Sequence, residues 1–179
     1  MDTFLALHGS LRSGSHTGTV LATLGSLLRE RGAEQVTWNG LAALPAYNPD
    51  LDPAEDGTAA LPAGVHAFRT AAESARGLVV VSPEYARGYP GFLKNGLDWL
   101  VGSQAVFDRP AAVVTASPGW KGGELAADGL AAVLTMMGAT PLHTLSIGQV
   151  VLKVDGGRVT DDPTLAALSR LADRLLAGH

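Results

Sequence analysis

Cysteine is absent from this chain of 179 residues. Its absence excludes disulfide bonds, thiolate nucleophiles and cysteine-ligated metal sites, so redox chemistry would need a bound cofactor. Charged residues are also scarce, at 17% of the sequence, and 13 basic against 17 acidic residues give a net charge of −4. Because the sequence has no basic run and no interleaving of basic with aromatic residues, we expect neither nucleic acid nor an anionic membrane as a partner.

Long hydrophobic runs are missing as well. No segment approaches the roughly 18 uninterrupted apolar residues that a membrane-spanning helix needs. The first residues, Met1-Asp2-Thr3, place no basic flank before the short apolar run that follows, so we expect a cytoplasmic protein. Apolar residues nevertheless make up 46% of the chain, and no linker or repeat divides it, which predicts one well-filled domain.

Short apolar runs alternate with longer segments of helical periodicity. Strands are expected at 3–8, 35–39, 77–81, 111–116 and 142–146, and helices at 17–31, 63–75, 90–101, 124–137 and from about 162. This alternation with short connections predicts a parallel sheet covered by helices on both faces. Ligands of such sheets bind beyond the carboxyl ends of the strands, which brings together the loops 9–17, 82–89 and 117–123.

The loop 9–17 is suited to binding a phosphate group. It reads Gly-Ser-Leu-Arg-Ser-Gly-Ser-His-Thr, in which glycines let the backbone approach a ligand and the start of the next helix adds favourable potential. Neutral donors would be the hydroxyls of Ser10, Ser15 and Thr17, and the positive charge would come from Arg12. His16 is either a further donor or an exposed residue at the helix start. The alternative for the whole loop is an ordinary polar connection in which Ser15 caps the helix.

Other kinds of site lack residues that they require. Gly9 and Gly14 have the spacing of a Walker A loop, but Ser15 and His16 stand where that motif needs lysine followed by serine or threonine. The sequence has no G-x-G-x-x-G after the first strand and no G-x-S-x-G, which disfavours a Rossmann dinucleotide site and a hydrolase. The scattered histidines show no ligand spacing, so we expect no metal. The following acidic cluster is interpreted as a solvated loop: Asp50, Asp52, Glu55 and Asp56.

Two further loops complete a resemblance to a known family. The loop after the third expected strand, with the helix after it, reads Ser-Pro-Glu-Tyr-Ala-Arg-Gly-Tyr-Pro-Gly-Phe-Leu-Lys-Asn-Gly-Leu-Asp-Trp-Leu from 82 to 100. The loop after the fourth reads Thr-Ala-Ser-Pro-Gly-Trp-Lys-Gly-Gly from 115 to 123. With the loop 9–17, and in this order and spacing, these motifs resemble the NADPH-dependent FMN reductase family, which includes quinone, azo-dye and chromate reductases. The resemblance implies a flavodoxin-like, three-layer α/β/α fold with a five-stranded parallel sheet of order 2-1-3-4-5, and a single FMN-binding domain over 1–179.

The resemblance also implies which residues hold FMN. The 5′-phosphate would be bound by Ser10, Arg12, Ser15 and Thr17, with His16 as a further candidate. The isoalloxazine ring would lie along Pro83, Glu84, Tyr85 and Ala86, and its other edge would meet Ser117, Gly119, Trp120, Gly122 and Gly123.

Three of these positions carry open questions. Ala86 stands where the family usually has asparagine, so one polar contact to the flavin is lost or made by the backbone. Thr17 also replaces a common asparagine, and we expect weaker flavin binding than is typical. Trp120 either stacks over the ring or seals the pocket.

The function implied by the resemblance is an NAD(P)H-dependent oxidoreductase. A hydride would pass from NADPH or NADH to FMN, and two electrons would then reach a small-molecule acceptor such as a quinone at the same place, giving ping-pong kinetics. We assign no catalytic acid or base, because the flavin carries the chemistry. The alternatives are a flavodoxin-type electron carrier or other non-enzymatic FMN-binding protein, and a sugar-phosphate or nucleotide binder that uses only the first loop. Arg12 and a charge of only −4 favour the enzyme over the carrier.

The segment 92–101 predicts self-association. It carries Phe92, Leu93, Leu97, Trp99, Leu100 and Val101 around much of a helix, which is more apolar surface than one buried stripe requires. In the family that the chain resembles, this helix lies at a dimer interface next to the flavin, and Lys94, Asp98 and Trp99 occupy the matching positions. A homodimer or homotetramer is therefore expected. The alternative is that Trp99 belongs to the core of its own chain.

Overall fold

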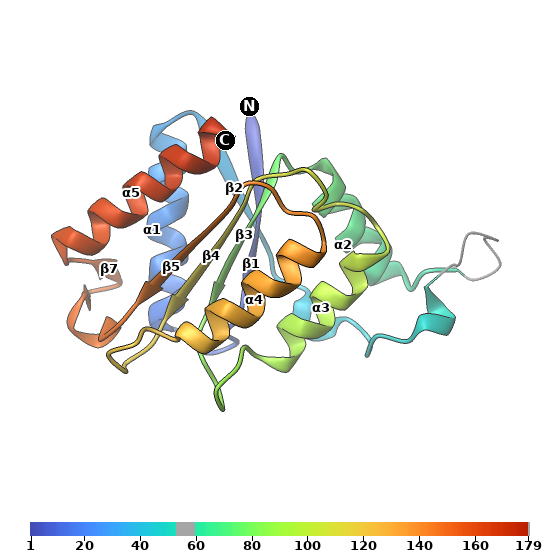
Figure 1. Cartoon of the computed structure of the whole chain (residues 1–179), viewed down its shortest axis with the longest axis horizontal. Helices are drawn as coiled ribbons and strands as arrows, with labels where there is room; N and C mark the ends of the chain where they lie inside the picture. The colour runs from blue at the N-terminus through green and yellow to red at the C-terminus, as the bar shows by residue number, and fades with distance from the viewer. Residues whose placement is uncertain (53–59, 179) are drawn as a thin grey trace.

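Five parallel strands form the central layer of the structure, a computed structural model that describes residues 1–52 and 60–178 (Figure 1). The strands are β1 (Asp2–His8), β2 (Ala33–Trp38), β3 (Gly77–Ser82), β4 (Ala111–Ala116) and β5 (Leu142–Ile147). Their order in the sheet is β2-β1-β3-β4-β5, and every neighbouring pair is parallel. The expected flavodoxin-like fold is thereby confirmed.

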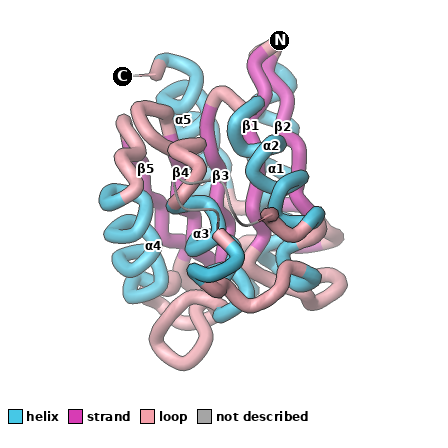
Figure 2. Tube along the Cα trace, turned by 90° about the vertical axis from the view of Figure 1, so that its right-hand side faces the viewer, coloured by secondary structure: helices cyan, strands magenta, loops and turns pink. Residues whose placement is uncertain are grey.

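Helices cover both faces of this sheet. The helices α1 (His16–Glu30) and α5 (Asp162–Ala177) pack on one face, where Phe4 and Ala6 of β1 are buried. On the other face, which is turned toward the viewer in Figure 2, lie α2 (Ala63–Ser74), α3 (Gly91–Val101) and α4 (Glu124–Met136). Because both faces are covered, every residue of β3 and β4 is buried, as continuous apolar runs predict. None of the described helices is both long and apolar enough to cross a membrane.

The element bounds differ little from those expected. β2 begins at Ala33, two residues before the expected start at 35, because Ala33 is buried and pairs with Asp2 of β1. A short antiparallel hairpin of β6 (Val154–Asp155) and β7 (Arg158–Val159) follows β5. The α5 helix begins as expected, with the carboxylate of Asp161 accepting a hydrogen bond from the Thr164 amide at 3.0 Å.

Most of the apolar surplus of α3 packs inside the chain, although Val101 remains 46% exposed, and this weakens the case for a partner surface on this helix. Trp99 is fully buried, its indole Nε1–H donates to the Pro45 carbonyl oxygen at 2.8 Å, and the Tyr47 ring packs edge-on with 4.9 Å between ring centroids. The connection after β2 thus covers the apolar side of α3 that was expected from the sequence to face a second protomer. Lys94 and Asp98 form an ion pair with each other along the helix. The oligomeric state itself stays a prediction.

One residue of the acidic cluster is also placed differently from the expectation of a solvated loop. The Asp52 carboxylate accepts a hydrogen bond from Arg69 Nη2 at 2.7 Å, and their side chains are only 14% and 9% exposed. Arg69 Nε also donates to the Trp99 carbonyl oxygen at 2.6 Å. Asp52 therefore belongs to a buried ion pair that fastens the connection to α2, and Arg69 in turn joins α2 to α3. Glu55 and Asp56 lie outside the described residues.

Candidate functional site

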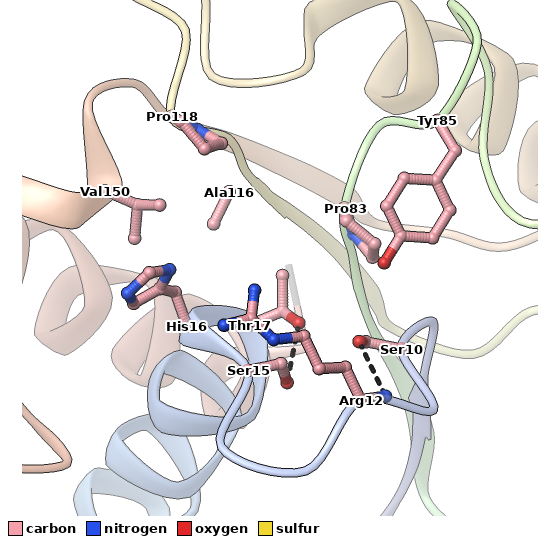
Figure 3. Close-up of a pocket in the computed structure, with 10 residues that line it drawn as sticks. All are labelled: Ser10, Arg12, Ser15, His16, Thr17, Pro83, Tyr85, Ala116, Pro118 and Val150. Carbon is pink, nitrogen blue, oxygen red and sulfur yellow. Dashed lines mark hydrogen bonds between the residues drawn. The ribbon is translucent and has the colours of Figure 1, made fainter.

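A pocket lies at the carboxyl end of the sheet, where the loops after β1, β3 and β4 meet (Figure 3). All five candidate residues of the loop 9–17 line it, together with two of the loop after β3. These predicted residues are Ser10, Arg12, Ser15, His16, Thr17, Pro83 and Tyr85. Sequence reasoning did not name the other three, which are Ala116, Pro118 and Val150.

The start of α1 arranges the donors of this pocket. Ser15 is the N-cap residue, and its Oγ accepts a hydrogen bond from the Gly18 amide at 3.1 Å. Capping uses a lone pair of the hydroxyl and leaves its proton available to a ligand. The two interpretations of this loop, as a helix cap and as a ligand site, are therefore compatible.

Arg12 supplies positive charge to a site without carboxylates. No Asp or Glu lines the pocket, and no ion pair within residues 1–52 and 60–178 involves Arg12. Its backbone amide donates to Ser10 Oγ at 3.3 Å, which holds the turn of the loop. Hydroxyls, a helix N-terminus and one guanidinium thus converge on one end of the pocket, a combination suited to a phosphate.

His8 adds a hydrogen-bonding group that sequence reasoning missed. Its Nε2 lies 2.9 Å from Thr17 Oγ1 and 3.4 Å from Ser15 Oγ. Burial lowers the pKa of this imidazole, so it is neutral at pH 7. The available signal was position, because His8 is the last residue of β1, directly before the loop, and points to the same face of the sheet as Phe4 and Ala6.

The loop after β3 forms one wall of the pocket with a tight turn. Tyr85 and Gly88 exchange backbone hydrogen bonds of 2.8 and 3.0 Å, and the two residues between them have positive φ angles, 49° at Ala86 and 65° at Arg87. This is the geometry of a two-residue hairpin turn that favours asparagine followed by glycine. Ala86 therefore stands where the backbone conformation favours asparagine, the residue that the resemblance also led us to expect.

Replacing Ala86 with asparagine should stabilise the protein. Asparagine tolerates a left-handed backbone better than alanine, so Ala86→Asn is expected to raise the free energy of unfolding by about 0.5–1 kcal/mol. Thermal unfolding of the flavin-free protein measures this, as an increase of roughly 1–4 °C. Ala86→Val is the matched control, because a β-branched residue in this conformation should destabilise. Equal melting temperatures for all three proteins would contradict the assigned strain.

Glu84 has a structural contact that its position in the motif did not predict. Its Oε2 accepts hydrogen bonds from the backbone amides of Leu125 and Ala126, at 3.1 and 3.2 Å, in the first turn of α4. The carboxylate thus caps that helix and does not line the pocket. Only its backbone remains available for the role expected beside a flavin ring.

The loop after β4 is attached to the segment that follows β5. Amides of Gln149 and Val150 donate to the carbonyl oxygens of Gly119 and Ser117, at 3.0 and 3.1 Å. Gly148 passes so close to this loop that a Cβ there would lie 2.0 Å from the Trp120 carbonyl oxygen. These contacts bring Val150 into the pocket. The fifth strand ends at the same edge of the sheet as the other strands, which was the signal available in the sequence.

Several expected residues of the third loop lie outside the pocket lining. Pro118 faces the pocket, whereas its neighbours do not line it. Trp120 is 76% exposed, and Lys121 Nζ lies 5.3 Å from the centroid of its ring. Residues that were predicted beside a flavin ring but do not line the pocket are Glu84, Ala86, Ser117, Gly119, Trp120, Gly122 and Gly123.

Comparisons with known proteins agree with the fold and the motifs. A model of the family described as NADPH-dependent FMN reductase matches residues 3–151. A quinone reductase of Escherichia coli K12 is 33% identical over 171 residues, which cover 92% of this chain and 88% of that protein. The solved structure of FerB, a flavoenzyme NAD(P)H:(acceptor) oxidoreductase from Paracoccus denitrificans, has a TM-score of 0.82 at 28% identity, with 99% of this chain and 96% of that chain covered.

A solved structure with a lower sequence identity to this chain supports the fold alone. An FMN-dependent NADH-azoreductase from Bacillus anthracis, solved in complex with FMN, has a TM-score of 0.69 at 16% identity and covers 98% of this chain and 99% of that one. The family match itself spans all three loops and the five strands of the sheet, except Asp2 at the start of β1. The resemblance seen in the motifs is confirmed, and the chain belongs to the NADPH-dependent FMN reductase family, whose members are NAD(P)H-dependent flavin oxidoreductases.

Proposed function

We propose that this protein binds FMN in the pocket at the carboxyl end of the sheet and reduces a small-molecule acceptor, of the quinone class, with electrons from NAD(P)H. The observation that carries the proposal is the convergence of Arg12 and three hydroxyls on the N-terminus of α1, in a pocket that no carboxylate lines. A phosphate monoester matches such a donor set in charge and in hydrogen-bonding capacity. The similarity to a quinone reductase supports the acceptor class.

The rest of the pocket lining fits the flat ring of FMN. Tyr85 is 53% exposed on one wall, and hydrocarbon groups provide the remaining surface. These apolar groups belong to Pro83, Ala116, Pro118 and Val150. Apolar walls with a few polar groups at one end are typical of cofactor pockets. We assign the phosphate to the loop 9–17 and the ring to the space between Tyr85 and Pro118.

The protein's part in the reaction is to bind and orient. The chemistry supplied by bound FMN is the transfer of two electrons from NAD(P)H to the acceptor. The Glu84 carboxylate is occupied at the start of α4, and no Asp or Glu of the described residues lines the pocket, so we assign no general acid or base. Donor and acceptor would approach the same open side of the pocket in turn, which predicts ping-pong kinetics.

An anaerobic reduction experiment tests this proposal. We expect the purified protein to be yellow, to bleach when NADPH or NADH is added without oxygen, and to recover its colour when benzoquinone follows. Initial rates at varied concentrations of both substrates should give parallel double-reciprocal lines. A yellow protein that neither nucleotide reduces would indicate an electron carrier instead. A colourless protein that FMN does not reconstitute would reject both functions.

Three further properties are proposed on narrower grounds. A homodimer or homotetramer rests on the family resemblance, since the apolar residues of α3 are largely covered within the chain. A cytoplasmic location rests on composition, and a single FMN-binding domain over residues 1–179 rests on composition together with the family resemblance. The nucleotide preference and the physiological acceptor are left to the kinetic comparison of both donors.

A further inference from the structure

A histidine lies behind the hydroxyl groups that face the pocket. His8 does not itself line the pocket, but its Nε2 lies 2.9 Å from Thr17 Oγ1, which does. Gly18, in the first turn of α1, lies against the ring: a Cβ there would be 3.4 Å from His8 Cε1, about van der Waals contact, and a tighter 3.1 Å from Ser15 Oγ. The imidazole therefore occupies a fitted position between the end of β1 and the start of α1.

The hydrogen bonds around His8 allow two arrangements of protons. A neutral imidazole carries one N–H, so Nε2 either accepts from the Thr17 hydroxyl or donates to it. If Nε2 accepts, the Thr17 proton is consumed, and the hydroxyl presents only lone pairs to the pocket. If Nε2 donates, Thr17 Oγ1 accepts from His8, and its own proton is free for a ligand.

The neighbouring hydroxyl depends on the same choice. Ser15 Oγ accepts a hydrogen bond from the Gly18 amide at 3.1 Å and, with no ligand in the pocket, another from the Thr17 hydroxyl at 3.3 Å. When His8 donates to Thr17, neither hydroxyl has to give its proton to the imidazole, and both protons can turn to an acceptor in the pocket. A phosphate accepts hydrogen bonds and donates few or none, so it favours this arrangement.

We propose that His8 is a positioning residue for the FMN phosphate: its Nε2–H fixes the Thr17 hydroxyl as an acceptor, so that the Thr17 and Ser15 protons donate to the phosphate. This inference rests on the proposed function and extends it to a residue outside the pocket. It also explains why a histidine that is partly buried and neutral is held beside two hydroxyls at the end of a strand.

Paired substitutions of His8 test the proposal. His8→Leu removes the donor, and we expect FMN binding to weaken about five- to twentyfold because hydroxyl donors lose their direction. Riboflavin lacks the phosphate, so its dissociation constant should stay within about twofold of wild type. His8→Gln places an amide N–H near the position of Nε2 and should restore most of the FMN affinity. Quenching of flavin fluorescence measures each of these dissociation constants.

Two controls separate this role from damage to the fold. His143→Leu removes another partly buried histidine, on β5, and should leave both flavin affinities unchanged. In a Thr17→Val background, His8→Leu should have little further effect, because the proposed action passes through the Thr17 hydroxyl. Equal weakening of FMN and riboflavin by His8→Leu, or additive effects in the double variant, would overturn the proposal.

A measurement on the unmodified protein keeps the test independent of folding. Nitrogen NMR of histidine-labelled protein with FMN should show the His8 proton on Nε2, and a proton on Nδ1 alone would overturn the inference.

The flavin affinities of wild type and Arg12→Ala show whether a negative result concerns the proposed phosphate site or only the role of His8. If wild type does not prefer FMN to riboflavin, the phosphate site and the role of His8 are both rejected. If Arg12→Ala removes that preference but His8→Leu keeps it, only the role of His8 is rejected.

Discussion

Replacing Arg12 with alanine is expected to weaken FMN binding by roughly ten- to a hundredfold and to leave riboflavin binding almost unchanged. Among the described residues that line the pocket, Arg12 is the one Lys or Arg, and no Asp or Glu lines the pocket to offset its charge. A hydrogen bond to a charged group is worth about 1.5–3 kcal/mol, which sets the size of the effect. Isothermal titration of the flavin-free protein with each flavin measures both affinities.

The comparison of two ligands makes the Arg12 result specific. Arg29→Ala is the matched control, because it removes the same charge from the opposite end of α1, where no pocket residue lies. That variant should bind both flavins as wild type does, apart from a small change at low salt. If Arg12→Ala binds FMN normally, or loses riboflavin to the same extent, Arg12 does not bind the phosphate and the loop has another role.

Replacing Trp99 with alanine is expected to lower the free energy of unfolding by about 3–5 kcal/mol. The side chain is fully buried in the core beside α2 and the sheet, and its loss also leaves the Pro45 carbonyl oxygen without the indole donor. Chemical denaturation of the variant and wild type at equal protein concentration measures the difference. Trp120→Ala, at a tryptophan that is 76% exposed, should change stability by less than about 0.5 kcal/mol.

A more conservative variant distinguishes a core role from an interface role for Trp99. Trp99→Phe keeps most of the buried volume and loses the hydrogen bond, so we expect a loss of only about 1–2 kcal/mol. Light scattering should then give the same particle mass for Trp99→Phe as for wild type, because the ring faces its own chain. A change in mass with unchanged stability would restore the interface interpretation.

Much of the sheet could be predicted from the sequence because its signals are local. The apolar runs of β3 and β4 are buried on both faces, and the start of α5 carries its cap in the sequence. The start of β2 was harder to predict, because Ala33 joins the strand only through its pairing with β1. The cover over α3 was also not predictable, because it comes from a connection with no periodicity of its own.

The residues of the site also divide into those that could be predicted from the sequence and those that could not. Residues of the loop 9–17 follow one another in the chain, so their convergence could be predicted from a single strand–loop–helix unit. His8 and Val150 reach the site through contacts between elements, and Glu84 is drawn away by the start of α4. Residue type and spacing carry no information about such contacts. The sequence therefore predicted the donors of the pocket better than the groups that orient or support them.

The lining of the pocket changes in character along its length, and this has a consequence for which molecules fit it. Donor groups gather at the start of α1, whereas Pro118, on the far side of the pocket from Ser10 and Ser15, offers only hydrocarbon (Figure 3). A ligand anchored by its phosphate at the first end has the position of its ring determined by the length of the chain between the two. The protein would thus select flavins by length as well as by charge, and the alignment of the ring with Tyr85 would depend on the ribityl chain rather than on contacts to the ring itself.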